Sequence, residues 1–177
     1  MAKVGNAIRK QNNLLTKQID NTILEWNPGN HFVDSEKRTA KGFAWVIKSD
    51  MTQEQYKELL RSQQGELDAV LMYQSLAKVV KTDTERETFL QLAKEEGRHA
   101  SVFHAYTKEG LKPKKTMARI MPILYYLLGR KRLYKLIAAG EYKAAVGYEH
   151  LIAYFPDVES VKNDEKRHGD MVSGLIK

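Results

Sequence analysis

Two Glu-x-x-His pairs constrain this chain more than any other feature, because each lies on the apolar face of a predicted helix. The first pair is Glu96 with His99, and the second is Glu165 with His168. A helix turns about 100° per residue, so residues three apart lie roughly 60° from each other and can point into one cavity. An unpaired carboxylate is costly to bury. The pairs therefore predict buried helix faces that bind something able to compensate these charges.

Each pair is preceded by a glutamate that is followed seven residues later by a tyrosine. In the first half of the chain these residues are Glu66 and Tyr73, and in the second half they are Glu141 and Tyr148. The pattern therefore occurs twice, which indicates an internal duplication with pseudo-twofold symmetry. Each tyrosine shares a helix face with its glutamate, so we expect its hydroxyl to hydrogen-bond a carboxylate. Ordinary packing of the tyrosine ring is the alternative.

Four carboxylates and two imidazoles around one point are a ligand set with which four-helix bundles hold two metal ions. Carboxylate oxygen and imidazole nitrogen suit iron and manganese. We expect Glu96 and Glu165 to bridge the two metals. Glu66 together with His99 is expected to cap one metal, and Glu141 together with His168 the other. Any one of these residues alone could be an exposed charge, but the ordered recurrence argues against that. The predicted ligands of two iron ions, with manganese as the alternative, are Glu66, Glu96, His99, Glu141, Glu165 and His168.

Apolar periodicity and capping residues predict four long helices after residue 51. The first is expected to open with a capping box of Thr52 and Gln55, and the second with a box of Thr84 and Glu87. Gly110 occupies the position expected of a glycine that ends the second helix. The predicted helices cover residues 52–80, 84–108, 131–153 and 158–177.

The segment of residues 111–129 separates the second helix from the third and is long enough to run from one end of a bundle to the other. The predicted fold is therefore all-α: a ferritin-like four-helix bundle of two helix hairpins joined by a long crossover. This bundle is expected to cover residues 52–177. Residues 1–51 are expected to form an N-terminal extension that is partly helical, because apolar residues recur there at helical spacing.

Other acidic residues and histidines are expected to lie away from the metal ligands. The angular spacing on their helices points His104, His150 and Glu95 to other directions, and His31 precedes the bundle. Glu149 is the one further carboxylate that the spacing allows near the site.

Composition excludes several classes of function. The chain has 177 residues, enough for one domain, and no cysteine, so it forms no disulfide, thiolate metal site or cysteine nucleophile. Its N-terminus lacks the apolar run of a secretory signal, and no segment has the length of a spanning helix. A soluble, cytoplasmic protein is therefore expected. The net charge is +7, but the basic stretch of the sequence matches no nucleic-acid-binding motif. No nucleic-acid partner is therefore predicted.

The positive charge is concentrated in the crossover and the start of the third helix. Residues 111–140 contain eight basic residues and no acidic one, interleaved with an apolar run at 123–128. A crossover packed on one side is the default interpretation. Contact of residues 111–135 with an anionic membrane surface is the alternative.

Residues 52–177 resemble the rubrerythrin family. The resemblance lies in the motifs ELDAVLMYQSLA, LAKEEGRHA, GEYKAAVGYEHL and DEKRHGD, which carry the predicted ligands. It implies a non-haem di-iron centre that reacts with peroxide or oxygen. Two features depart from the family pattern: the chain lacks the cysteines of a rubredoxin module, which implies an external electron donor, and Ala144 stands where an additional carboxylate is expected. The apolar crossover also resembles that of membrane-bound di-iron hydroxylases of quinone biosynthesis.

Three functions are consistent with these features. The first is a di-iron oxidoreductase that reduces peroxide or oxygen with electrons from an external donor. The second is an iron-handling protein or ferroxidase for which Fe(II) is the substrate. The third is a hydroxylase that acts on a lipid or quinone at a membrane surface. In each case a homo-oligomer, most simply a dimer, is expected.

Overall fold

The computed structural model describes residues 51–176, and these contain helices and no strand. The predicted N-terminal extension, residues 1–51, lies outside the described residues apart from Met51, and His31 lies outside them too. The all-α prediction is confirmed for the described part of the chain. Its elements are α3 (Gln53–Ala77), α4 (Asp83–Thr107), α5 (Thr116–Leu128), α6 (Arg130–Tyr148), the short 3-10 helix η1 (Glu149–Leu151) and α7 (Val158–Gly174).

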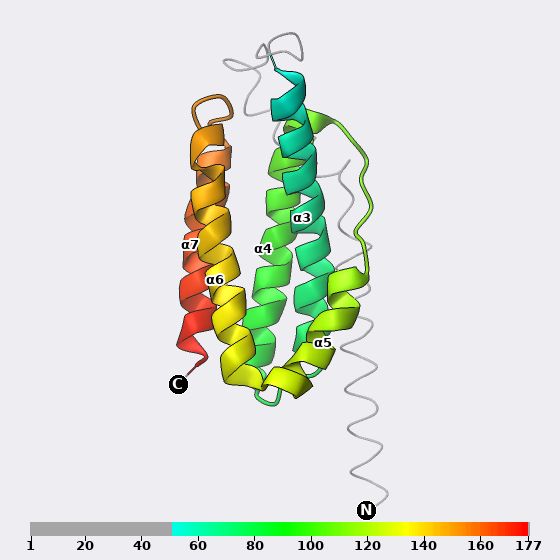
Figure 1. Ribbon diagram of the computed structural model, residues 1–177, viewed down its shortest axis with the longest axis vertical. Helices are drawn as coiled ribbons and strands as arrows, with labels where there is room; N and C mark the ends of the chain where they lie inside the picture. The colour runs from blue at the N-terminus through cyan, green and yellow to red at the C-terminus, as the bar shows by residue number, and fades with distance from the viewer. Residues whose placement is uncertain (1–50, 177) are drawn as a thin grey trace, which may run out of the picture. The chain divides into compact units, whose positions relative to one another are not determined.

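Four long helices form the bundle as two antiparallel hairpins (Figure 1). Helix α3 pairs with α4, and α6 pairs with α7. The two hairpins meet where α4 contacts α7, and these are the helices that carry the two Glu-x-x-His pairs. The chain leaves the end of α4, descends beside α3 and enters α5, which leads to the start of α6 at the opposite end of the bundle (Figure 1). This is the predicted arrangement of two hairpins and a long crossover.

The start of α3 is as predicted, whereas the start of α4 differs. Thr52 and Gln55 form a reciprocal capping box, with bonds of 2.9 and 3.1 Å. At α4 the box is formed by Thr82 and Glu85, two residues before the predicted pair. Both pairs fit the capping pattern, but Glu85 also accepts a hydrogen bond of 2.9 Å from the hydroxyl of Tyr134 on α6. A tertiary partner therefore decides between two equivalent local signals.

Helix α4 ends at Thr107, within one residue of the predicted end, but the predicted glycine does not cap it. Lys108 takes the left-handed conformation, with φ of 57°, and its N–H donates to the carbonyl of His104 at 2.8 Å. The following carbonyl, that of Glu109, accepts from the amide of Gln63 on α3 at 2.9 Å. This bond turns the chain toward α3 before Gly110 is reached, so Gly110 does not cap the helix.

The crossover is held against α3 by backbone bonds and then becomes helical. The Gln64 amide donates to the carbonyl of Lys112 at 3.0 Å, and Asp68 accepts from the N–H of Lys114 at 2.6 Å. The helix that follows, α5, has Pro122 inside it. A proline removes one helical hydrogen bond, so the sequence did not indicate a helix there. Packing of one face of α5 against the bundle compensates for that loss.

The third predicted helix, 131–153, is α6 followed by η1. The α-helix ends at Tyr148, and the 3-10 turn places Leu151 in the core before the chain reaches Pro156. At the opposite end of the bundle, one apolar cluster joins α5 to the four long helices. It includes Tyr73, Phe89, Tyr125 and Tyr134.

Candidate metal centre

All six predicted ligands lie inside the bundle and are buried. Each occupies the inward face of its helix, between apolar residues that pack in the core. Glu66 comes from α3, Glu141 from α6, and one Glu-x-x-His pair from each of α4 and α7. The side chains are nearly inaccessible to solvent, with residue exposures of 4% for Glu66, 1% for Glu96, 1% for His99, 9% for Glu141, 2% for Glu165 and 0% for His168.

The two imidazoles define two half-sites that share a carboxylate. His99 Nδ1 lies 3.6 Å from Glu66 Oε2, and His168 Nδ1 lies 3.7 Å from Glu141 Oε2. Glu96 lies between the rings, with Oε2 at 3.4 Å from His99 Nδ1 and Oε1 at 3.2 Å from His168 Nδ1. The rings stack with centroids 5.2 Å apart. This places Glu96 where a carboxylate would bridge two ions.

Glu165 completes the cluster from α7. Its Oε1 lies 2.9 Å from His99 Nδ1, yet neither atom has a hydrogen-bond partner. Glu96 Oε1 and His168 Nδ1 are likewise buried without a hydrogen-bond partner. One donor atom from each of these four residues lies within 4.8 Å of all the others. Such atoms are costly to bury unless a cation takes their lone pairs, so these residues fit a bound metal ion.

Charge repulsion and burial shift the pKa values of the cluster strongly. Burial, together with the Glu96 carboxylate, raises the pKa of Glu66 to about 8. Burial also raises the pKa of Glu165 to about 10, although its contact with His99 acts in the opposite direction. For Glu96 the effect of burial is outweighed by contacts with Glu66 and both histidines, so its pKa is lowered. The contacts within the protein thus favour the protonated form of Glu66 and Glu165 and the ionised form of Glu96.

The pKa values of both histidines in the cluster are raised. Burial disfavours a charged imidazole, but contacts with Glu165, Glu66 and Glu96 outweigh it and raise the pKa of His99 to about 12. His168 behaves in the same way, and its contacts with carboxylates raise its pKa to about 10. The cluster therefore holds protons at neutral pH, and a cation that binds here must displace them.

Each tyrosine forms a hydrogen bond to the helix of the other hairpin. Tyr73 on α3 donates its hydroxyl proton to Glu141 Oε1 on α6, and Tyr148 on α6 donates to Glu66 Oε1 on α3. The predicted hydrogen bonds to carboxylates are confirmed, and each tyrosine serves the glutamate of the other half. Burial and the adjacent carboxylate hold the pKa of each tyrosine well above its ordinary value, so both hydroxyls remain donors.

Two further carboxylates orient the histidines from outside. Glu95 Oε2 lies 2.6 Å from His168 Nε2, and Asp164 Oδ2 lies 3.3 Å from His99 Nε2. Arg167 bonds both carboxylates, at 2.6 Å to Glu95 and 2.8 Å to Asp164. Hydrogen bonds to the outer imidazole nitrogen fix the orientation of a ligating histidine and increase its basicity.

The exclusion of Glu95 was therefore wrong. The angular argument correctly placed Glu95 about 100° from Glu96, away from the centre of the cavity. It overlooked that this direction leads to the neighbouring helix, where the outer nitrogen of His168 emerges. A recognisable signal was present, because an acidic residue directly precedes the glutamate of both Glu-x-x-His pairs: Glu95 in one and Asp164 in the other.

His104 and His150, which were excluded as ligands, do lie away from the cluster. His104 Nδ1 is 3.0 Å from the carbonyl of Glu109 at the end of α4, and His150 Nε2 is 3.1 Å from the Glu58 carboxylate. Neither bonds a predicted ligand.

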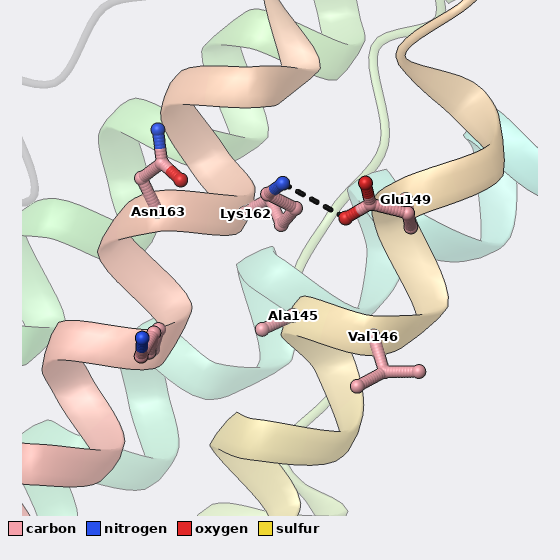
Figure 2. A pocket seen from close by; sticks show the side chains of 6 residues that line it. Ala145, Val146, Glu149, Lys162 and Asn163 are labelled. Atoms are coloured by element: carbon pink, nitrogen blue, oxygen red, sulfur yellow. Dashed lines mark hydrogen bonds and ion pairs between the residues drawn. The ribbon is translucent and has the colours of Figure 1, made fainter.

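Glu149, the one additional carboxylate that the spacing allowed, is also away from the cluster. It forms an ion pair of 2.8 Å with Lys162 at a shallow surface groove between α6 and α7 (Figure 2). Tyr148 ends α6, so Glu149 belongs to the 3-10 turn, where the helical angle used in the prediction no longer applies.

Comparison with protein families agrees with this geometry. The family model described as Rubrerythrin matches residues 57–176, which is more than half of the chain and includes all six predicted ligands. The chain belongs to the rubrerythrin family. Membership indicates a di-iron carboxylate protein, and the buried glutamate and histidine side chains could hold a metal. Neither a curated protein nor a solved structure matches the chain. Among the helices of residues 51–176, none is long and apolar enough to cross a membrane.

Proposed function

We propose that this rubrerythrin-family protein is a non-haem di-iron oxidoreductase that reduces peroxide or oxygen with electrons from an external donor. The observation that carries the proposal is the set of four buried, unpartnered donor atoms on Glu96, His99, Glu165 and His168. Two bound iron ions would supply the electrons that reduce the oxidant. Family membership and the choice of oxygen and imidazole ligands both support iron.

The protein groups have distinct parts in this function. Glu96 would bridge the ions, because each of its oxygens faces a different histidine. Tyr73 and Tyr148 hold the outer glutamates by hydrogen bonds and so keep their oxygens directed inward. Burial of all the ligands excludes bulk water, which strengthens each electrostatic contact. Two electrons and two protons are needed to convert one peroxide to two waters, and the donor and the solvent would supply them.

Iron storage or ferroxidase activity is the second candidate. It is favoured by the lack of cysteine, since the chain cannot itself hold a rubredoxin iron that would return electrons to the centre. Ala144 stands on α6 at the position where the family pattern leads us to expect an additional carboxylate. In this function Fe(II) is itself the electron donor and leaves the site as Fe(III).

Reconstitution under anaerobic conditions tests the proposal. The protein is loaded with Fe(II), bound iron is counted, and ferric absorbance is followed after addition of peroxide. We expect about two irons per chain, their loss in Glu96→Ala, and full loading of the control Glu149→Ala, whose carboxylate lies at the surface groove. Failure of the wild-type protein to bind stoichiometric iron or manganese would refute a di-metal function.

The source of electrons after the first turnover distinguishes the two candidate functions. An oxidoreductase needs an added reductant for every turnover after the first. An iron-handling protein continues to oxidise excess Fe(II) without one. A third candidate, hydroxylation of a lipid or quinone, requires that the outer surface of α5 bind a membrane.

A further inference from the structure

An unbroken series of aromatic rings leads from the candidate metal centre to the protein surface. It begins at Tyr73, which bonds Glu141 and stacks on Phe89 with ring centroids 5.8 Å apart. Phe89 meets the edge of Tyr134 at 5.4 Å, and Tyr134 lies 6.4 Å from Tyr125 on α5. The series therefore links three helices of the bundle to the crossover.

The outer end of the series is exposed. Tyr125 is buried and contacts Tyr126 with ring centroids 5.5 Å apart, while Tyr126 is 70% exposed. Four of the five residues in the series are tyrosines, whose side chains can give up an electron and later regain it. A reductant in solution can thus reach one end of a path whose other end contacts a carboxylate of the cluster.

Two buried tyrosines of the series have a carboxylate as hydrogen-bond acceptor. Tyr73 donates to Glu141, and Tyr134 donates to Glu85 at 2.9 Å. This matters because a neutral tyrosine gives up an electron readily only when its phenolic proton can leave at the same time. A carboxylate at hydrogen-bonding distance supplies that acceptor and returns the proton when the tyrosine is reduced.

The other half of the duplicated site lacks such a series. Tyr148, the counterpart of Tyr73, packs on Phe103 with centroids 5.2 Å apart, and no further ring contact continues from Phe103 among residues 51–176. The difference arises because the crossover contributes Tyr125 and Tyr126 on one side of the bundle only.

We propose that Tyr73, Tyr134 and Tyr126 form an electron relay between the candidate metal centre and the surface of α5. This relay rests on the proposed redox function and specifies where its electrons enter. Phe89 lies between Tyr73 and Tyr134, and Tyr125 lies between Tyr134 and Tyr126; both are packed spacers that are not themselves oxidised.

When peroxide oxidises the centre, Tyr73 would give one electron to it and its proton to Glu141. Tyr134 then reduces the Tyr73 radical and passes its own proton to Glu85, while Glu141 returns the first proton. Tyr126 in turn reduces the Tyr134 radical and releases its proton to water, while Glu85 returns the second proton. A one-electron reductant in solution finally reduces the Tyr126 radical, which regains a proton from water. The net result is one electron moved from that reductant to the centre, with every phenol restored.

Tyr134→Phe is the decisive variant, because it keeps the ring but removes the phenol. Tyr106→Phe is its matched control: Tyr106 also bonds a carboxylate, Asp157 at 2.8 Å, and packs on Phe155, but lies outside the series. Thermal unfolding and iron content are measured first, so that only folded and loaded protein is compared.

The readout is the position of the radical rather than the rate of turnover. Iron-loaded protein is treated with peroxide in the presence of a nitroso spin trap and no reductant, and the adduct is located by peptide mass spectrometry. We expect the wild type and Tyr106→Phe to carry the adduct on Tyr126, and Tyr134→Phe to lose it there. Tyr154, which is 61% exposed, reports radicals generated in solution and should remain unlabelled.

The outcomes distinguish the relay from the function on which it rests. If the wild type binds no iron or forms no ferric product with peroxide, the proposed function fails. If the protein reacts but Tyr134→Phe labels Tyr126 as strongly as the wild type, the relay is wrong and the function stands. Equal labelling of Tyr126 and Tyr154 also overturns the relay, because it shows attack from solution.

A separate observation concerns the outer face of α5. Met121 and Tyr125 point into the bundle and are buried, whereas Ile123 is 57% exposed and Leu127 is 74% exposed. Ile120, three residues before Ile123 and seven before Leu127, shares this outer face and is 40% exposed. A row of exposed apolar residues along one helix face usually marks a surface that binds a protein or a membrane.

Basic residues lie on both sides of α5 in the sequence. Residues 112–140 contain no acidic residue, and the exposed basic side chains within α5 or close to it in the sequence include Lys114, Lys115, Arg119, Lys131, Arg132 and Lys135. An apolar helix face bordered by lysine and arginine is complementary to an anionic bilayer, whose headgroups attract the cations while the acyl boundary takes the apolar side chains. A nonpolar protein partner would not account for the charge.

The geometry points to α5 as a helix that binds the surface of anionic membranes. Flotation of the full chain with vesicles tests this, using vesicles that contain phosphatidylglycerol and vesicles of phosphatidylcholine alone. We expect binding to the anionic vesicles only, weaker binding at high salt, and loss of binding in the double variant Ile123→Ser, Leu127→Ser. Val146→Ser is the control, because Val146 is 76% exposed on α6.

Two results would overturn the membrane assignment. One is the absence of binding to anionic vesicles by the wild type. The other is a wild-type dimer in solution that the double variant converts to monomer, which would assign the face to a second copy of the chain.

Discussion

Replacing Glu85 with glutamine should destabilise the bundle, although the hydrogen bonds of Glu85 go to Thr82, Arg130 and Tyr134 and to no predicted metal ligand. Glu85 is 2% exposed and accepts hydrogen bonds from the Tyr134 hydroxyl at 2.9 Å and from Arg130 at 3.2 Å. Its second oxygen accepts from the N–H and hydroxyl of Thr82, at 3.1 and 3.0 Å. One carboxylate thus caps α4 and ties it to the start of α6.

The magnitude follows from what glutamine can still do. The side-chain carbonyl of glutamine can accept one pair of these hydrogen bonds, but only as a neutral acceptor. Its NH₂ group cannot accept the other pair. Hydrogen bonds to charged groups contribute about 1.5–3 kcal/mol and neutral ones about 0.5–1.5 kcal/mol. Arg130 is partly exposed, so its share is small. We therefore expect Glu85→Gln to lower the free energy of unfolding by about 2–4 kcal/mol at pH 7.

The effect should depend on pH in a defined direction. Burial would raise the pKa of Glu85, but hydrogen bonds from Tyr134, Thr82 and Arg130 outweigh it and hold the pKa below its ordinary value. A carboxyl with a lowered pKa in the folded state stabilises the protein above its unfolded-state pKa of about 4.3. That stabilisation is lost as the pH falls through the lower, folded-state pKa. The difference between wild type and variant should therefore shrink below about pH 4.

Urea unfolding at pH 7 and at low pH measures both effects. Glu87→Gln is the matched control, because Glu87 lies on the same helix, is exposed and belongs to the capping pair that the structure does not use. We expect the control to unfold within about 0.5 kcal/mol of wild type. Equal destabilisation by the two variants, or a Glu85 effect that persists unchanged at low pH, would refute the reasoning.

Four other outcomes are expected. The affinity for Fe(II) should rise between about pH 6 and pH 8, because binding displaces protons from a cluster whose carboxyl and imidazole pKa values are raised; isothermal titration in two buffers checks this. Glu95→Gln should weaken metal binding by about 10–100-fold, whereas Glu149→Gln should leave it unchanged in the same titration. Gly169→Ala should lower stability by about 1–3 kcal/mol, since its new methyl group would lie 2.5 Å from the Tyr142 ring. Gly140→Ala, where no atom lies within 4 Å, should raise the thermal midpoint instead.

The order of the ligands made most of the site predictable. Glu66, Glu96, His99 and their counterparts are placed by helical angle alone, since each inward position lies on an apolar stripe within one continuous helix. The bundle topology followed from the length of the segment between Glu109 and Gly129. Local rules were sufficient here because they describe residues of the same helix.

Features that depend on a neighbouring helix could not be predicted in this way. The choice of Glu85 over Glu87 as a capping residue depends on Tyr134, which is 49 residues away. The partner of Glu95 is a histidine 73 residues away. Helix α5 forms despite Pro122 because one of its faces packs against the bundle. In each case a tertiary contact selects among alternatives that the local sequence leaves equal.

The duplication itself shows how the two half-sites come to differ. Within the site the halves are nearly equivalent, since His99 and His168 meet their outer glutamates at 3.6 and 3.7 Å. Beyond it the chain must connect two hairpins, and only one side of the bundle can receive the connection. That side acquires α5 and a ring series from Tyr73 to solvent, while Tyr148 meets Phe103. Two chemically similar metal positions would therefore face unequal surroundings, which is what a centre requires if electrons are to enter from one direction.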